Sequence, residues 1–380
     1  MIGILGDGQL SLMLVEAALS LGQDVVVAGE DKDSPVARTY PEVYVGDDYV
    51  SFFSQARVVT LENEFYTPSQ LKSWQKKYGF ELIPDMLSYE SLSTKWKQSE
   101  FFASLGIQTP KTLLLPKEWN QNHIAEIHQW VNEHFSFPVV IKKSYGGYDG
   151  YGTAVANDAE ALESILIKFG IEDKQEIILQ TFVELECECA QSILLDGRGH
   201  AIELPLVRTF QQDGICHLVT TDHLLSDEIV SQIHDIIQKL KKTTLKGLFA
   251  FEFFVTKSGQ VLVNEAAPRP HNSQHITSDA CDKSQFDYLI DLCAYKPIKD
   301  ETITAKPSIM INLLGRSNGS KYQLTLPPIS SDYLIYPKLY NKKHCRLGRK
   351  MGHLNVLANN SKAQQELISL GQRIFRDYQL

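Results

Sequence analysis

The sequence has little of what marks a secreted or membrane-spanning protein. Six cysteines occur in 380 residues, and none forms a C-x-x-C pair, so neither a disulfide scaffold nor a cysteine zinc site is indicated. No apolar run approaches the ~18–20 residues of a membrane span. The apolar N-terminus lacks the basic region of a signal peptide. We therefore expect a cytoplasmic protein without membrane association.

Positive charge is also scarce in this chain. It has 37 Lys and Arg against 46 Asp and Glu, which gives a net charge of -9 and a pI of about 5.7. Nucleic-acid binding needs clustered cations to neutralise phosphates, so we expect no nucleic-acid partner. The run "KKHCRLGRK" at 342–350 is a local exception, which predicts either a site for one small anion or a solvated basic face.

A Walker loop is absent, because G-x-x-x-x-G-K-[ST] occurs nowhere in the chain. The chain instead opens with "GILGDGQLSLML", in which Gly6 and Gly8 stand between a strand-like run and an apolar helical pattern. This resembles the start of a dinucleotide-binding unit, although Ser11 replaces the third glycine of that fingerprint. The acidic pair Glu30 and Asp31 lies at about the spacing for a ribose hydroxyl, but it also fits an ordinary turn.

The order of predicted elements indicates an α/β and α+β protein. Residues 1–90 alternate between strands and helices, which predicts a parallel, doubly wound sheet. Helices are expected at 91–106 and 226–243, and strands around a Gly-rich turn at 139–157 and across 177–204. From about residue 301 the chain is strand-rich, and a last helix closes it. Cys187 and Cys189 share one face of an alternating strand, where we expect buried, inert thiols rather than metal ligands.

The segments "FAFEFFV" and "VLVNE" predict a hairpin around Gly259. A two-residue turn would pair Glu252 with Glu265, and a three-residue turn would pair it with Asn264. In both cases two carboxylates come close on adjacent strands. Two such charges at ~5 Å repel by about 3 kcal/mol at an effective dielectric of ~20. Oxygen ligands of this kind suit Mg²⁺; the alternative is that one glutamate faces solvent and pairs with a lysine.

Two further segments carry groups that could bind an anion. Four glycines within residues 146–152 follow Lys142 and Lys143, in a loop that fits either a phosphate-covering flap or a plain flexible hairpin. Adjacent strand residues point to opposite faces, so one of the two lysines is expected in a site. Arg269 follows Glu265 by four residues in a Pro-bracketed loop, and its planar fork suits a carboxylate or phosphate. Solvated loop polar groups are the alternative there.

Taken together, these segments resemble the ATP-grasp enzymes, and within that superfamily the 5-(carboxyamino)imidazole ribonucleotide synthases, the ATPase subunit of phosphoribosylaminoimidazole carboxylase. The similar stretches span almost the whole chain, and the most specific are "GGYDG", "NEAAPRPHNS" and "GRKMGH". The resemblance implies an ATP-grasp fold with an N-terminal doubly wound, Rossmann-like pre-ATP-grasp domain (1–90), an ATP-grasp domain (91–300, with a flap subdomain at about 110–182) and a small C-terminal β-rich domain (301–380).

The resemblance also implies an activity and its partners. Bicarbonate would attack the γ-phosphate of ATP to give carboxyphosphate, and the amine of 5-aminoimidazole ribonucleotide would then be carboxylated in de novo purine biosynthesis. The implied cofactors are ATP and Mg²⁺, with Mn²⁺ as a substitute. A homodimer is expected, with the carboxyaminoimidazole ribonucleotide mutase as a functional partner.

The site residues implied by the resemblance fall into four groups. The ATP-binding group comprises Lys95, Lys142, Gly147, Tyr148, Gly150, Gly152, Thr153, Gln180, Thr181, Phe182, Val183, Glu188, Gln211 and Asn264. The metal ligands would be Glu252 and Glu265. The catalytic group would be Arg269, Asp149, His271 and Asn272. The aminoimidazole ribonucleotide would meet Gly8, Gln9, Leu10, Glu62, Glu64, Lys342, Arg349 and Lys350.

Some positions depart from the family pattern. Tyr151 stands where the family usually has Arg or Lys, Gln211 where it has His, and Gln274 where it has Gly. These departures keep open another ATP-grasp carboxylate–amine ligase with a different acceptor. An NAD-dependent oxidoreductase would explain only the opening loop, and a non-catalytic regulatory module would not need paired glutamates beside an arginine.

Overall fold

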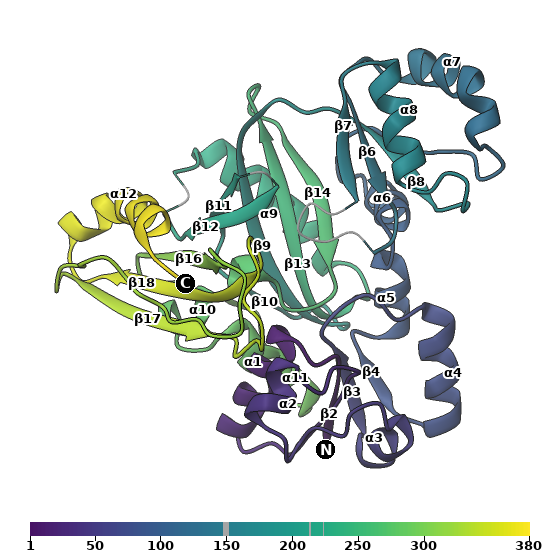
Figure 1. Ribbon diagram of the computed structural model, residues 1–380. Coiled ribbons are helices and arrows are strands. Elements are labelled where there is room, and N and C mark those ends of the chain that lie inside the picture. Colours follow the sequence, from purple (N-terminus) through teal and green to yellow (C-terminus); the bar gives the residue numbers. More distant parts are fainter. Residues whose placement is uncertain (147–151, 213, 223) are drawn as a thin grey trace.

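The computed structural model describes residues 1–146, 152–212, 214–222 and 224–380 (Figure 1). The N-terminal region forms a parallel sheet in the order β2-β1-β3-β4, which confirms the doubly wound prediction. Its elements are β1 (Ile2–Leu5), α1 (Gln9–Ser20), β2 (Val25–Ala28), α2 (Pro35–Thr39), α3 (Tyr49–Gln55), β3 (Val58–Leu61), α4 (Pro68–Tyr78) and β4 (Glu81–Ile83).

Both faces of this sheet are covered because its strands are apolar on both sides. Ile4 and Val27 face α1 and a later helix, α11 (Gln285–Cys293). Val26 and Val59 face the aromatic side chains of α3 and the helix α4. Strands buried on both faces are typical of parallel sheets. This arrangement leaves the loops after the strands, including Gly6–Gln9, at the carboxyl edge of the sheet.

The helix predicted over 91–106 is present as α6 (Lys95–Ser104), but its predicted start is wrong, because residues 91 and 92 end a preceding helix, α5 (Met86–Leu92). Thr94 lies between them with extended backbone angles, and its hydroxyl accepts a hydrogen bond from the Lys97 amide. An N-cap of this kind begins a new helix, and it places Lys95 in the first turn of α6.

The flap region forms a separate antiparallel sheet in the order β5-β8-β6-β7, seen at the upper right of Figure 1. Helices α7 and α8 pack on it through their own apolar core. Its elements are β5 (Thr112–Leu114), η1 (Gln121–His123), α7 (Ile124–His134), β6 (Val139–Lys143), β7 (Thr153–Ala156), α8 (Ala159–Lys168) and β8 (Ile177–Thr181). The strands predicted on either side of the Gly-rich turn are confirmed as β6 and β7.

The main sheet runs in the order β14-β13-β9-β11-β12-β16-β18-β17, with β10 and β15 at its side. Its first part comprises β9 (Leu185–Asp196), β10 (Ala201–Glu203), β11 (Val207–Gln212), β12 (Ile215–Thr220), α9 (Asp227–Lys241), β13 (Lys246–Thr256), β14 (Val261–Ala267), η2 (Asn272–Gln274), α10 (Thr277–Ala280) and β15 (Glu301–Thr302). The helix predicted at 226–243 is confirmed as α9. The hairpin of β11 and β12 carried no sequence prediction.

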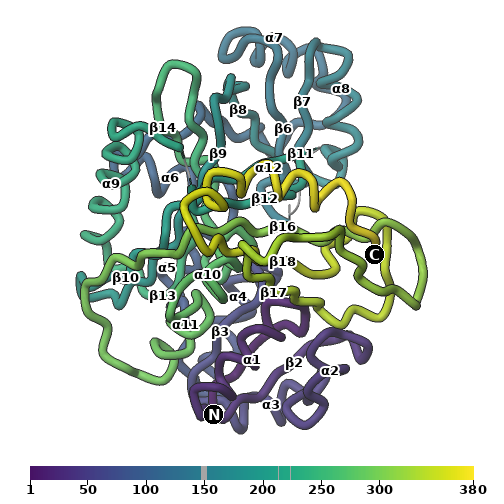
Figure 2. The backbone as a smooth tube through the Cα atoms, turned by 90° about the vertical axis from the view of Figure 1, so that its left-hand side faces the viewer, coloured from purple at the N-terminus to yellow at the C-terminus, as the bar shows by residue number. Residues whose placement is uncertain are grey.

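The C-terminal strands continue the same sheet because β16 pairs with β12. This part comprises β16 (Ser308–Leu314), β17 (Tyr333–Leu339), β18 (Lys350–Ala358) and α12 (Ser361–Asp377). Helix α12 covers one face through Leu367, Leu370 and Ile374. In Figure 2, β17 lies beside α1 of the N-terminal region, and Lys338 forms an ion pair there with Glu16. The C-terminal strands therefore join the N-terminal sheet to the main sheet.

Candidate active site

A cavity of about 780 Å³ lies where the flap sheet, the main sheet and the N-terminal loops meet. Its wall combines apolar side chains such as Val155 and Phe254 with charged ones such as Glu265 and Arg269. A concave site of this size with convergent polar groups is typical of a small-molecule site. Three segments that are far apart in sequence thus contribute to one cavity.

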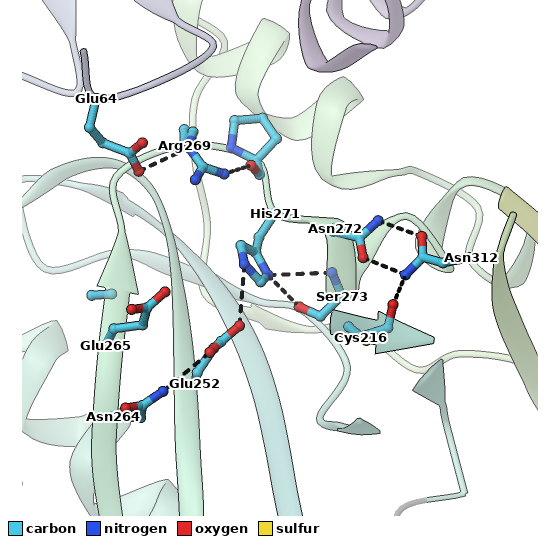
Figure 3. Close-up of polar contacts among 12 residues, drawn as sticks. Glu64, Cys216, Glu252, Asn264, Glu265, Arg269, His271, Asn272, Ser273 and Asn312 are labelled. Atoms are coloured by element: carbon cyan, nitrogen blue, oxygen red, sulfur yellow. Dashed lines mark hydrogen bonds and ion pairs between the residues drawn. The ribbon is translucent and has the colours of Figure 1, made fainter. Parts of the chain in front are cut away.

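The hairpin of β13 and β14 places two glutamates opposite each other. Glu252 pairs with Glu265, and the register then shifts so that Phe253 pairs with Val263. Asn264 is the extra residue of this β-bulge. Its Nδ2 lies 3.4 Å from the Glu252 carboxylate. The first of the two pairings expected from the sequence is therefore present, and the bulge adds Asn264 to the same wall (Figure 3).

Two lysines neutralise part of this acidic wall. Lys95, at the start of α6, forms an ion pair with Glu265. Lys142, on β6 of the flap sheet, donates from Nζ to the Asn264 Oδ1 at 3.0 Å. The neighbouring Lys143 faces away, with its Nζ over the Phe169 ring. One lysine of the pair enters the site, as strand alternation predicted.

The charges of these groups are strongly coupled. Burial raises the pKa of Glu252, and the neighbouring charge of Glu265 raises it further. Burial acts the same way on Glu265, but Lys95 and Lys142 outweigh it and hold its pKa below the ordinary value. Burial, together with the charge of Lys95, lowers the pKa of Lys142 to about 8. The two lysines therefore favour the ionised form of Glu265. Ionisation of Glu252 as well would require further positive charge nearby.

The donor atoms of this wall suit a hard cation. Glu252, Glu265 and Asn264 offer only oxygen ligands on one side, the set that Mg²⁺ prefers. A cation between Glu252 and Glu265 would offset the repulsion that, after burial, raises the pKa of Glu252. Among the described residues, no group of three or more His, Cys, Asp or Glu side chains could hold a metal ion. The residues present therefore fit a cation whose remaining ligands come from a substrate or water.

The loop after β14 closes the other side of the cavity. Arg269 forms an ion pair with Glu64 of the N-terminal region, with Nε 2.9 Å from Oε1. The Ser273 amide donates to His271 Nδ1 at 3.3 Å, so neutral His271 carries its proton on Nε2. That Nε2 lies 3.3 Å from Glu252 Oε1. Asn272 also lines the cavity, and Figure 3 shows its side chain directed at Asn312, while His271 is directed at Glu252.

Several residues predicted to bind ATP line the same cavity, from the flap sheet and from strands β9 and β11 of the main sheet. Thr153, Gln180, Thr181, Phe182, Val183, Glu188 and Gln211 all line the cavity. Burial raises the pKa of Glu188 to about 7, which a hydrogen bond from Gln211 partly opposes. Gly152, the residue before β7, has a φ of +80°. The predictions for Gly147, Tyr148, Asp149 and Gly150 fall outside the described residues, as does the departure at Tyr151.

The N-terminal loop reaches the cavity through Gln9, Leu10, Glu62 and Glu64. The Glu62 carboxylate is already engaged, because it accepts hydrogen bonds from the Gly8 amide at 2.6 Å and the Leu10 amide at 3.1 Å. A Cβ on Gly8 would lie 2.3 Å from the same carboxylate. The helix N-terminus that binds pyrophosphate in a dinucleotide fold is thus filled by a side chain of the protein itself. This argues against NAD as the ligand.

The cations of the basic run 342–350 differ in whether they line the cavity. Lys350 lines the cavity. Lys342 donates from Nζ to the Lys350 carbonyl at 2.7 Å, and Arg349 donates to the His344 carbonyl at 3.1 Å. Neither Lys342 nor Arg349 is part of the described cavity wall. Their predicted contact with a substrate phosphate stays a prediction.

Sequence reasoning missed the buried amides that hold the loop after β14. The Gln285 side chain bonds both the amide and the carbonyl of His271, at 2.8 and 2.9 Å. Asn312 pairs with Asn272. One signal was available, because a polar Asn312 interrupts the apolar strand "IMINLL". The structure also describes the six cysteines as free, with Cys189 buried and Cys187 half-buried.

Comparison with known protein families identifies the three regions of this chain. Residues 100–286 match the model of the ATP-grasp domain, residues 1–87 that of the ribonucleotide synthetase preATP-grasp domain, and residues 308–367 that of the phosphoribosylaminoimidazole carboxylase C-terminal domain. The chain therefore has the ATP-grasp fold with a pre-ATP-grasp region and a C-terminal region, as predicted, and it belongs to the ATP-grasp class of enzymes.

Similar proteins of known name indicate which ATP-grasp enzymes the chain resembles. An N5-carboxyaminoimidazole ribonucleotide synthase from Staphylococcus epidermidis is 29% identical, over 94% of this chain and 92% of that protein. The structure of N5-carboxyaminoimidazole ribonucleotide synthetase from Thermotoga maritima has a TM-score of 0.80 and 26% identity, and covers 100% of this chain and 98% of that one. The synthase from Aspergillus clavatus, complexed with ATP, has a TM-score of 0.81 and 25% identity over 98% of each chain. Within the ATP-grasp class, the chain is a member of the N5-carboxyaminoimidazole ribonucleotide synthase family.

Proposed function

We infer that the chain is an ATP-dependent carbon–nitrogen ligase that carboxylates the amine of 5-aminoimidazole ribonucleotide, using bicarbonate, in purine biosynthesis. One observation carries this conclusion. The paired glutamates Glu252 and Glu265, Lys142 and the loop of Arg269 line one cavity, whose other wall comes from the N-terminal loop at Gln9. Lys95 is held beside this cavity by its ion pair with Glu265. Such a cavity supports two substrates that react next to the terminal phosphate of ATP.

ATP would lie between the flap sheet and the main sheet. Phe182 and Val183 fit the adenine side, and Glu188 the ribose. Lys95 and Lys142 are placed to bind phosphate oxygens, for which each would exchange its present partner, Glu265 or Asn264. Glu252, Glu265 and Asn264 would hold Mg²⁺, which Mn²⁺ could replace, and the ion would supply positive charge against the phosphoryl oxygens.

The first chemical step would join bicarbonate to phosphorus. A bicarbonate oxygen attacks the γ-phosphorus, the bond to the bridging oxygen breaks, and ADP leaves, which gives carboxyphosphate. Positioning and charge neutralisation dominate such phosphoryl transfers. Arg269 is suited to hold the carboxylate part of this intermediate through its planar fork. His271 presents its Nε2 hydrogen on the side of Glu252, and Asn272 supplies an amide beside it.

The second step would form the carbon–nitrogen bond. Carboxyphosphate breaks down to phosphate and CO₂, and the lone pair of the substrate amine takes up the carbon while the amine loses a proton. Gln9, Leu10 and Glu64 line the cavity on the side where the aminoimidazole ribonucleotide would lie, with Lys350 near its phosphate. Asp149 is proposed as the acceptor of a hydrogen bond from the amine. Exclusion of water from the closed cavity would protect the intermediate.

A second candidate is an ATP-grasp ligase with another acceptor. It is favoured by the position of Lys342 and Arg349 outside the described cavity wall, since the phosphate of the nucleotide would then have fewer cationic partners than the family pattern provides. A homodimer, a cytoplasmic location and transfer of the product to a mutase are further proposals. Among the described residues, no helix is long and apolar enough to cross a bilayer.

The test is an ADP-release assay with purified protein, Mg-ATP and bicarbonate. Stimulation of ADP release by aminoimidazole ribonucleotide supports the proposed function. ADP release that is unaffected by this nucleotide supports the second candidate, and its dependence on other amines would then identify the acceptor. Omission of bicarbonate serves as the control, because the proposed reaction forms carboxyphosphate from it.

A further inference from the structure

Asn312 is a buried polar residue that the reaction described above does not use. It lies in the middle of β16, and its side chain is 0% exposed, so it cannot touch a substrate in the cavity. The neighbouring Ile311 and Leu313 face the opposite side of the sheet and pack with α12. A primary amide in such surroundings must satisfy its hydrogen bonds within the protein.

The partners of Asn312 fix which way its amide points. Its Nδ2 donates to the Cys216 carbonyl at 2.9 Å, and a carbonyl only accepts. The amide nitrogen must therefore face β12, and the second hydrogen of Nδ2 goes to Asn272 Oδ1 at 2.7 Å. Asn312 Oδ1 in turn accepts from Asn272 Nδ2 at 2.9 Å. Figure 3 shows this chain of contacts from Cys216 to Asn272.

The two hydrogen bonds between Asn312 and Asn272 also fix the orientation of the Asn272 amide at the cavity wall. Asn272 lines the cavity, and its amide could be turned by half a rotation at little steric cost. A turned Asn272 would set its nitrogen against the Asn312 nitrogen and its oxygen against the Asn312 oxygen, so both hydrogen bonds would be lost. One N–H of Asn272 remains after the pairing, and its direction is set by Asn312.

We propose that Asn312 is a positioning residue, which fixes the Asn272 amide so that its remaining N–H is directed at the bound bicarbonate and at the carboxyphosphate formed from it. This proposal rests on the proposed function, since bicarbonate is the anion that the loop of Arg269 and Asn272 would bind. It gives the C-terminal strands a part in the chemistry itself, beyond the binding of a substrate phosphate.

The test is a double-mutant cycle on ADP release. Asn272→Ala and Asn312→Ala should each lower kcat by about ten-fold or more, because misplacement of a group by ~1 Å can cost about a hundred-fold. If Asn312 acts through Asn272, the double variant should be no slower than Asn272→Ala alone. A double variant as slow as the product of the two single effects would overturn the proposal, as would a wild-type kcat for Asn312→Ala.

Two further variants separate positioning from folding. Asn312→Asp keeps the size and the acceptor but loses both donated hydrogen bonds, and it should also lower kcat. Ile311→Val, on the opposite face of the same strand, should lower the Tm and leave kcat unchanged. If Ile311→Val lowers both the Tm and kcat, the loss of activity reflects the stability of the sheet, and the proposal is overturned.

A structural readout keeps this test apart from that of the proposed function. In a crystal structure of Asn312→Ala, the Asn272 amide should leave its present rotamer or adopt two. An Asn272 that keeps its rotamer and its place would refute the positioning role, whatever the substrate is. Wild-type protein without bicarbonate-dependent ADP release would refute the proposed function alone.

Discussion

Glu62→Gln is the substitution that best tests how the N-terminal loop is built. The carboxylate of Glu62 accepts hydrogen bonds from the amides of Gly8 and Leu10, and the Ser11 hydroxyl lies 3.3 Å from the same group. These amides lie at the N-terminus of α1, where a negative charge is favourable. A glutamine keeps one oxygen, so one of the two amides would face an NH₂ group instead of an acceptor.

The size of the effect follows from these contacts. A hydrogen bond to a charged group contributes about 1.5–3 kcal/mol, and an unsatisfied buried amide costs about 1–3 kcal/mol. The lost charge at the helix N-terminus adds about 0.3–1 kcal/mol. Burial of the carboxylate opposes these terms, since it raises the pKa of Glu62. We therefore expect a loss of about 2–4 kcal/mol, which lowers the Tm of a cooperative unit of about 150–250 residues by roughly 4–16 °C.

Thermal unfolding followed by fluorescence measures this change, and ADP release measures the KM for aminoimidazole ribonucleotide. Because the loop carries Gln9 and Leu10 into the cavity, the KM should rise together with the fall in Tm. Ser11→Ala is the control, since it leaves both amides bonded to Glu62 and removes only the hydroxyl, with its hydrogen bond to the Gly6 carbonyl at 2.7 Å. A Glu62→Gln protein with a wild-type Tm and a raised KM would refute the reasoning, because Glu62 would then serve the substrate and not the loop.

Other predictions concern the proposed metal ligand Glu265, the strand β18 and the buried carboxylate of Asp291. Glu265→Gln should abolish ADP release, and turnover near that of the wild type would contradict its assignment as a metal ligand. Gly352→Ala should lower the Tm, since its Cβ would lie 2.3 Å from the Lys338 carbonyl oxygen and relief of such overpacking costs about 1–3 kcal/mol. Burial raises the pKa of Asp291, but hydrogen bonds from Lys283 and Lys296 outweigh it and hold the pKa below the ordinary value. The stability from this carboxylate is therefore present above the unfolded pKa of about 3.9 and is lost as the pH falls through the folded value. Asp291→Asn should lower the Tm at pH 7 and have less effect near pH 3, as measured by thermal unfolding at both values; an equal effect at both would contradict the ion-pair account.

The local residue pattern was enough to predict the strands that carry the paired glutamates and the site lysine. Alternation in "FAFEFFV" and "VLVNE" predicted the hairpin and the approach of Glu252 to Glu265, because cross-strand neighbours follow from the strand period alone. The same period showed that one of Lys142 and Lys143 would enter the site. By contrast, the split between α5 and α6 was missed, because a cap at Thr94 competes with an uninterrupted helical pattern and the sequence does not show which is favoured.

The opening glycines show where local pattern is insufficient. Gly6 and Gly8 resembled a phosphate-binding loop, and their positions between a strand and a helix were predicted correctly. The amides of Gly8 and Leu10 instead donate to the Glu62 carboxylate, 52–54 residues away in the chain. Which anion meets a helix N-terminus depends on the neighbouring strand of the sheet, and pairing between strands is not encoded in the loop itself.

The sequence by itself determined the alternation of strands and helices in residues 1–90, the approach of Glu252 to Glu265 and the resemblance to ATP-grasp enzymes, since each depends on residue type and spacing over a few positions. Only the tertiary structure decided that Glu62 fills the loop, that Arg269 pairs with Glu64 and that Asn312 directs Asn272. These contacts join residues 40–205 positions apart in the chain, on elements that meet because their apolar faces must be buried. The geometry of the candidate site is therefore a consequence of packing between sheets, which no local stretch of the chain contains.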